Sequence, residues 1–175
     1  GYRGASRYIR EPDIFLFYVE AIKQVRAEFK NLYVMVPFVR TPAELKGVKQ
    51  LLAEEGLVRS DQFKLWMMVE VPSNVIILDK FIDVGIDGIS IGSNDLTQLV
   101  LGIDRDSEAL ADTFDERDDA VMAAIQTAVA VARRRGITVS ICGQAPSVYP
   151  EVTEKLVEWG ITSVSVSPDM IDRTR

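Results

Sequence analysis

Two carboxylates stand where apolar segments of the sequence end. Glu70 follows the apolar run 65–69, and Asp95 lies in the turn Ser93-Asn94-Asp95 directly after the apolar run 88–92. Two carboxylates leave most of an octahedral shell to water and substrate oxygens, which is how Mg²⁺ is commonly held in phosphoryl-transfer sites. The spacing therefore favours a Mg²⁺ site at Glu70 and Asp95. Two simpler interpretations stay open: a solvated charge at a strand end for Glu70 and a helix N-cap for Asp95.

The single cysteine of the sequence, Cys142, also ends an apolar run, 138–142. A thiol at the mouth of a sheet can donate a proton to carbon when a nearby cation adjusts its pKa. A lone cysteine is otherwise a small buried hydrophobic residue. Arg3 and Arg105 fall in loops; their guanidinium groups suit a phosphate, although many loop arginines are simply solvated.

Short apolar, β-branched runs alternate with segments of helical periodicity. The expected strands, buried on both faces, are 33–37, 65–70, 88–92, 138–142 and 163–167. The expected helices are 13–29, one that begins at Thr41, 74–81, 96–101, 115–135 and 150–159. The apolar stripe of the first helix is expected to comprise Ile14, Phe17, Tyr18, Ala21, Ile22 and Val25. This alternation predicts five βα units and a parallel sheet. A complete (β/α)8 barrel needs at least roughly 200 residues, so residues 1–175 form either a small open α/β domain or part of a barrel, as a single domain.

Composition narrows the classes of partner. Lys and Arg number 20 against 26 Asp and Glu, a net charge of −6, which argues against nucleic acid or an anionic membrane surface as partner. One cysteine, with no long apolar run or signal-peptide pattern, favours the cytoplasm. The sequence has no histidine, so it contains no Ser-His or Cys-His pair and no phosphohistidine. It begins at Gly1 rather than Met, which we interpret as a piece of a longer protein.

Six strings, in order and spacing, resemble the C-terminal PEP/pyruvate-binding domain of the phosphoenolpyruvate (PEP)-utilising enzymes. They are Gly1-Tyr2-Arg3-Gly4, Val34-Met35-Val36-Pro37-Phe38, Met68-Val69-Glu70-Val71-Pro72, Gly92-Ser93-Asn94-Asp95-Leu96-Thr97-Gln98, Cys142-Gly143-Gln144-Ala145-Pro146-Ser147 and Ser163-Val164-Ser165-Val166-Ser167-Pro168-Asp169. The family includes PEP synthases (pyruvate, water dikinases), pyruvate phosphate dikinases and enzyme I of the sugar phosphotransferase system. Gln144 is similar to the synthase branch, because the other two usually have glutamate there.

The resemblance implies the last five βα units of a (β/α)8 TIM barrel of the PEP/pyruvate type. Glu70 and Asp95 would bind Mg²⁺, which would hold pyruvate or its enolate. Cys142 would be the acid–base group at the methylene carbon of PEP. Met68 would pack near the pyruvate methyl group.

The resemblance also implies a phosphoryl site and partners. Arg3 and Arg105 would contact the transferring phosphoryl group, with Asn94 beside it, and two further arginines of the family fall on strands that this sequence does not match. The implied reaction converts ATP, pyruvate and water into AMP, PEP and phosphate, with the phosphohistidine and nucleotide-binding domains of the parent enzyme as partners. Alternatives are an enzyme I or dikinase-type domain and a non-catalytic truncated barrel that acts as an assembly scaffold. Because five strands leave two unpaired edges, we expect a homo-oligomer, and we expect the chain alone to be inactive.

Overall fold

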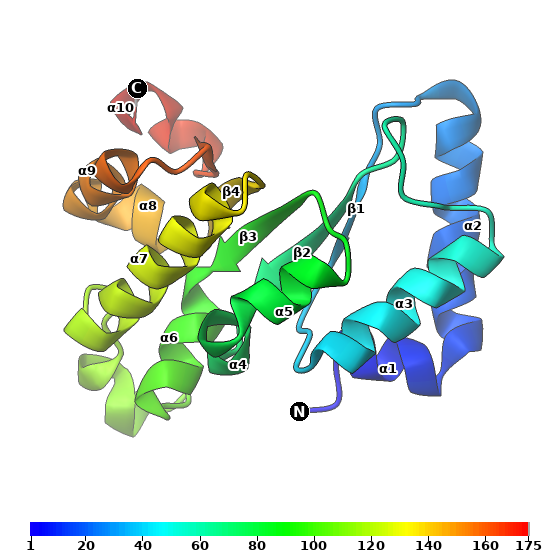
Figure 1. Ribbon diagram of the computed structural model, residues 1–175. Coiled ribbons are helices and arrows are strands. Elements are labelled where there is room, and N and C mark those ends of the chain that lie inside the picture. Colours follow the sequence, from blue (N-terminus) through cyan, green and yellow to red (C-terminus); the bar gives the residue numbers. More distant parts are fainter. Residues whose placement is uncertain (175) are drawn as a thin grey trace.

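The computed structural model describes residues 1–174 and is built on one parallel sheet of five strands (Figure 1). The strands pair in chain order, so β1 and β5 form the two edges. They are β1 (Val34–Val36), β2 (Leu65–Val69), β3 (Gly88–Gly92), β4 (Thr138–Cys142) and β5 (Ser163–Val164). The predicted α/β fold with five parallel strands is thereby confirmed.

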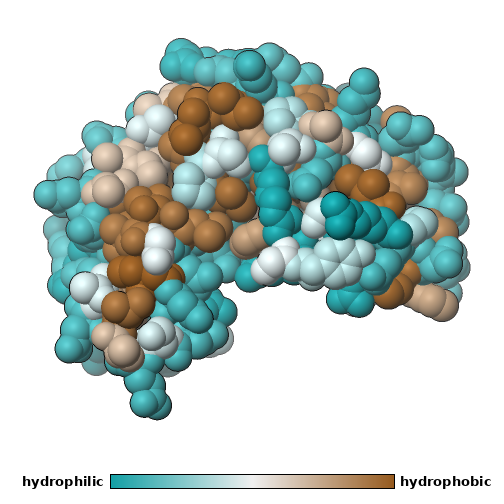
Figure 2. Space-filling view, turned by 90° about the horizontal axis from the view of Figure 1, so that it is seen from below, coloured by the Kyte–Doolittle hydropathy of each residue, from teal (hydrophilic) through white to brown (hydrophobic). Residues whose placement is uncertain are grey.

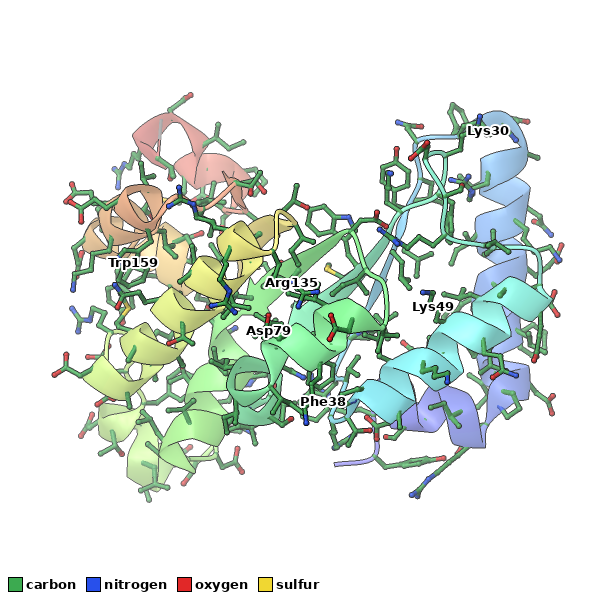
Figure 3. The ribbon with its side chains drawn as sticks, viewed as in Figure 1. Lys30, Phe38, Lys49, Asp79, Arg135 and Trp159 are labelled. Atoms are coloured by element: carbon green, nitrogen blue, oxygen red, sulfur yellow. The ribbon has the colours of Figure 1, made fainter. Side chains whose placement is uncertain are left out.

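Helices connect successive strands, and α3, α5 and α7 lie across one face of the sheet (Figure 1). The α-helices are α1 (Ala5–Arg10), α2 (Pro12–Glu28), α3 (Pro42–Glu54), α4 (Pro72–Ile76), α5 (Leu78–Asp83), α6 (Ser93–Leu101), α7 (Asp119–Arg134), α8 (Ala145–Val148), α9 (Pro150–Trp159) and α10 (Ile171–Thr174). Two 3-10 turns are η1 (Glu108–Thr113) and η2 (Pro168–Met170). Asp79 of α5 and Arg135, directly after α7, face each other and form an ion pair at 2.9 Å (Figure 3).

The two faces of the sheet differ in polarity because successive strand residues point to opposite sides. Met67, Ile89 and Ile141 are fully buried in the apolar core under the helices. Their neighbours Ser90 and Cys142 therefore lie on the opposite, inner face. Figure 2 looks onto the end of the molecule where the strands finish and shows that the molecule is bent into an arch. The concave side of this arch is the inner face, as in a segment of a barrel wall.

Several expected helices have different limits in the structure, and the one expected at 96–101 begins at Ser93. The helix expected at 74–81 is split at Ile77, which leaves helical geometry at φ −124° and ψ 35°. The helix expected at 115–135 begins only at Asp119, because the Asp118 carboxylate accepts the amide of Ala120 at 2.8 Å and caps it. Helix α1 was not expected.

The expectation for α2 and for the last strand was only partly met. Phe15 and Val19 of α2 are buried, whereas Phe17 and Tyr18 of the predicted apolar stripe are 78% and 58% exposed. The strand expected at 163–167 is reduced to two residues and is not buried on both faces. Strand β1 is not buried on both faces either, because Met35 is exposed at the edge of the sheet. Among residues 1–174, no helix combines the length and the apolar character needed to cross a lipid bilayer.

Candidate active site

Two residues that could carry chemistry, Glu70 and Cys142, lie on either side of Gly92 at the carboxyl end of the inner face. Gly92 pairs with Cys142 across β3 and β4, and Glu70 follows Val69, the partner of Ile91 across β2 and β3. Glu70, Gly92 and Cys142 thus form one layer. A Cβ on Gly92 would lie 2.7 Å from Cγ of Glu70, so only glycine lets the glutamate lie across the layer.

Hydrogen bonds to the segments that follow β1 and β2 hold Glu70 in place. Its Oε2 accepts the amide of Phe38 at 2.8 Å. Oδ1 of Asn74 accepts the amides of Glu70 at 3.1 Å and Val71 at 2.9 Å, while Nδ2 of Asn74 donates to the carbonyl of Val39 at 2.6 Å. Glu70 is only 7% exposed, so its interpretation as a solvated charge is wrong.

Burial affects the pKa of the Glu70 carboxyl group. Desolvation raises its pKa most strongly, and the negative charge of Asp95 raises it further. The amide of Phe38 and the charge of Arg3 act in the opposite direction. A buried carboxylate that also faces a second carboxylate is stabilised by any cation placed between them.

Asp95 is held by Arg3 rather than by its own helix. Nη1 and Nη2 of Arg3 each donate to one carboxylate oxygen of Asp95 at 3.0 Å. Helix α6 has Gly92 as its N-cap and no side-chain cap, so the interpretation of Asp95 as an N-cap is wrong. The Arg3 side chain is half-exposed yet fixed in a bidentate pair, and it is therefore not a merely solvated loop arginine.

The ring of Phe38 packs against the guanidinium groups of Arg3 and Arg40. This role was not identified from the sequence. The guanidinium groups of Arg3 and Arg40 lie 4.2 Å and 4.7 Å from the centre of the Phe38 ring. Phe38 lies at the foot of α3, beyond the end of β1 (Figure 3). Its φ of 47° is unusual for a residue with a side chain. Gly4 packs directly on it, because a Cβ there would lie 2.6 Å from Cβ of Phe38.

Cys142 is half-buried in polar surroundings. Burial raises the pKa of its thiol, and the charges of Glu70 and Asp95 raise it further, while a hydrogen bond with Ser90 opposes the shift. The thiol therefore keeps its proton and can act as a proton donor. Ser90 was not anticipated, although its place between Ile89 and Ile91 in a strand of period two put a polar group on the inner face.

Asn94 and Arg105 both line a neighbouring cavity of about 500 Å³, together with Gln144 and Phe114. Oδ1 of Asn94 accepts the amide of Gln144 at 3.3 Å. Arg105 has a 43% exposed side chain, and its nearest carboxylate is that of Asp106 at 4.0 Å. The structure thus places Arg105 on the same cavity as Asn94, whereas Arg3 lies beside Asp95.

Met68 lies on the inner face next to the Glu70 layer. It is 8% exposed. Its terminal methyl group would be 3.0 Å from a Cβ on Gly92. Met68 can therefore supply an apolar contact within reach of the carboxylates.

The donor atoms fit a divalent cation that keeps most of its shell for water and substrate. Across the described residues, no three His, Cys, Asp or Glu side chains are grouped so that they could hold a metal ion. Glu70 and Asp95 are the candidate pair. Carboxylate oxygens are the ligands that Mg²⁺ prefers, and Mg²⁺ needs few of them from the protein. Desolvation raises the pKa of Glu70 and the charge of Asp95 raises it further, so a cation bound between the two carboxylates would stabilise the charged form of Glu70.

Comparison with known sequences gives a family match over the whole chain. The family model described as "PEP-utilising enzyme, PEP-binding domain" matches residues 1–175. The probable phosphoenolpyruvate synthase of Staphylothermus marinus and the phosphoenolpyruvate synthase of Aeropyrum pernix are each 56% identical over 182 residues, covering 100% of the chain. The phosphoenolpyruvate synthase of Escherichia coli is 44% identical over 179 residues, covering 99% of it. The chain spans 22% of the length of each of these relatives.

A solved structure shares the fold. A HpcH/HpaI aldolase/citrate lyase family protein from Burkholderia cenocepacia superposes with a TM-score of 0.59 at 18% sequence identity. The match covers 82% of this chain and 62% of the other. The neighbour supports the TIM-barrel type of the fold, and at this identity it shows the fold alone.

Proposed function

The chain belongs to the PEP-utilising enzymes, as their PEP-binding domain, and we propose that it forms the PEP- and pyruvate-binding catalytic site of a PEP synthase. The observation that carries this proposal is the convergence of Glu70, Asp95, Arg3 and Cys142 at neighbouring strand ends. Gln144 favours a synthase over an enzyme I or dikinase-type domain.

Glu70 and Asp95 are proposed to hold Mg²⁺. Bound there, the ion would supply positive charge to the carboxylate and enolate oxygens of the substrate. Glu70 is preorganised for this role because the amide of Phe38 fixes Oε2. The Arg3 guanidinium balances the charge of Asp95 and aligns its two oxygens.

Arg3, Arg105 and Asn94 are proposed to bind the phosphoryl group. Guanidinium groups present paired N–H donors that match phosphate oxygens. Oδ1 of Asn94 accepts the Gln144 amide, so the amide nitrogen of the same side chain can donate to a phosphoryl oxygen. Together these donors would stabilise negative charge as the phosphoryl group transfers.

Cys142 is proposed to move the proton at carbon. Towards pyruvate, the S–H bond breaks and a C–H bond forms at the methylene carbon of the enolate. Towards PEP, the thiolate takes the same proton from the pyruvate methyl group. Burial raises the pKa of the thiol and keeps this proton in place, and Met68 would pack against the methyl group.

The phosphoryl donor must come from outside this sequence, which contains no histidine. We propose that phosphohistidine and nucleotide-binding domains of a longer enzyme complete the reaction of ATP, pyruvate and water to AMP, PEP and phosphate. The chain alone would not turn over these substrates.

The test is PEP formation by the complete protein that carries this sequence. Glu70→Gln and Asp95→Asn should each lower the rate by at least about 100-fold, with partial recovery at high Mg²⁺ concentration. Asp61→Asn, at an exposed carboxylate, is the matched control and should retain the rate. A wild-type protein that forms no PEP from ATP and pyruvate would overturn the proposal.

A further inference from the structure

Glu116 is a buried carboxyl group that the proposed chemistry does not use. It lies in the connection between α6 and α7 and is 4% exposed. Its Oε1 has no hydrogen-bond partner within residues 1–174. An ionisable group is rarely buried without a partner or a function.

The carboxyl group of Glu116 faces the starts of two helices that follow site strands. The hydroxyl of Ser93, the first residue of α6, and the amide of Ala145, the first residue of α8, both lie against it. Desolvation raises the pKa of Glu116, and these two contacts partly offset the increase, while Asp115 adds to it. The Glu116 side chain thus lies next to the segments that follow β3 and β4.

These two strand ends are closely joined. Oγ of Ser93 donates to the carbonyl of Cys142 at 3.2 Å, and the amide of Gln144 donates to Oδ1 of Asn94 at 3.3 Å. Gly143, at φ 106°, lies so near Ser93 that any side chain there would collide with its hydroxyl. The position of Asn94 relative to Cys142 therefore depends on how these two strand ends are held together.

Glu116 also belongs to the loop that carries Arg105. This loop closes the cavity that Arg105 shares with Asn94. Arg117, the neighbour of Glu116, pairs with Glu151 at 3.5 Å and lies 4.3 Å from the centre of the Tyr149 ring. An exposed ion pair of this kind contributes little to stability. Within the loop of residues 102–118, Glu116 is the buried residue.

We propose that Glu116 is a positioning residue whose buried carboxyl group fastens the Arg105 loop to the ends of β3 and β4 and thereby fixes the phosphoryl-binding groups against Cys142. The effect on catalysis rests on the proposed function. The attachment of the loop to the two strand ends through Glu116, called the tether below, does not depend on it.

The experiment compares Glu116→Ala, Glu116→Gln and Glu108→Ala in the complete protein. Glu108 is exposed in the same loop and is the matched control. Peptide-resolved hydrogen exchange should show the amides of residues 143–148 exchanging about tenfold faster in Glu116→Ala. Glu116→Gln keeps an acceptor oxygen and should stay close to wild type, as should Glu108→Ala.

Kinetics in the PEP-consuming direction separate positioning from loss of folding. Glu116→Ala should raise KM for PEP by about tenfold with a smaller fall in kcat, and Glu116→Gln should restore most of the loss.

A fall in kcat at unchanged KM would indicate fewer folded molecules and would overturn the positioning role. Unchanged exchange in Glu116→Ala would overturn the tether. A wild-type enzyme without activity would refute the proposed function and leave the exchange result to decide the tether.

Discussion

Arg3 and Asp95 are joined by two parallel hydrogen bonds of 3.0 Å although 92 positions separate them in sequence. The pair ties the segment before α1 to the start of α6. It also places a fixed guanidinium group beside a carboxylate proposed to bind Mg²⁺. Arg3 would therefore link the proposed phosphoryl-binding and metal-binding groups.

Replacing Arg3 tests whether PEP formation depends on the two parallel hydrogen bonds to Asp95 and not only on the positive charge. Arg3→Lys keeps the positive charge but cannot form two parallel bonds, so PEP formation should fall by roughly 10- to 100-fold. Arg7→Lys is a suitable control, because Arg7 pairs with Glu11 on the surface of α1. Steady-state rates of the complete protein give the comparison, and equal rates for both variants would count against the role of Arg3.

Gly92→Ala should disable the site without unfolding the domain. The new Cβ would lie 2.9 Å from Oε1 of Glu70 and 3.0 Å from Cε of Met68, so Glu70 must move. We expect a loss of about 1–3 kcal/mol in the free energy of unfolding together with a loss of PEP formation. Gly56→Ala, strained at φ 81° but in open space, should cost stability and leave activity intact. Activity in Gly92→Ala at the level of Gly56→Ala would contradict this expectation.

The limits of the buried strands could be predicted from sequence, whereas the contacts of the site could not. Strand β3 matches its prediction at both ends because it is an apolar run buried on both faces, and α9 is bounded by Pro150 and Gly160. The outward-facing Phe17 of α2 could not be foreseen, since periodicity shows that a helix has an apolar stripe and not what the stripe contacts. Phe38 and Glu116 escaped notice because their roles depend on contacts distant in sequence.

Replacing Asp87 should lower the free energy of unfolding without affecting the proposed site. Asp87 lies at the opposite end of β3 from the site, where its carboxylate accepts two bonds from Arg59 at 2.9 Å and the amide of Leu65 at 2.9 Å. Desolvation raises its pKa, but these bonds together outweigh it and leave the pKa lowered. We expect Asp87→Asn to reduce the free energy of unfolding by about 1–3 kcal/mol at neutral pH.

The pH dependence of that difference has a definite sign. Because the pKa of Asp87 is lower in the folded state, its stabilisation is present above the unfolded-state pKa and is lost as the pH falls through the folded-state value. Denaturant titrations from neutral to acidic pH should show wild type and Asp87→Asn converging. A constant difference would refute the assignment.

The edges of the sheet should make the 175-residue chain self-associate when it is produced alone. Strand β1 is an edge, and Met35 on it is 44% exposed. Unpaired edges pair with other chains. Light scattering should give a mass above the 19.5 kDa of one chain, and Met35→Lys should lower it. A monodisperse wild-type monomer would contradict this prediction.

The proton-transfer role of Cys142 is the central claim, and isotope exchange in the complete protein tests it most directly. Cys142→Ala should lose exchange of the pyruvate methyl protons with solvent and lose PEP formation, while ATP-dependent phosphorylation of the protein persists, because only the carbon step needs the thiol. Methyl exchange and PEP formation at the wild-type rate in Cys142→Ala would contradict the account.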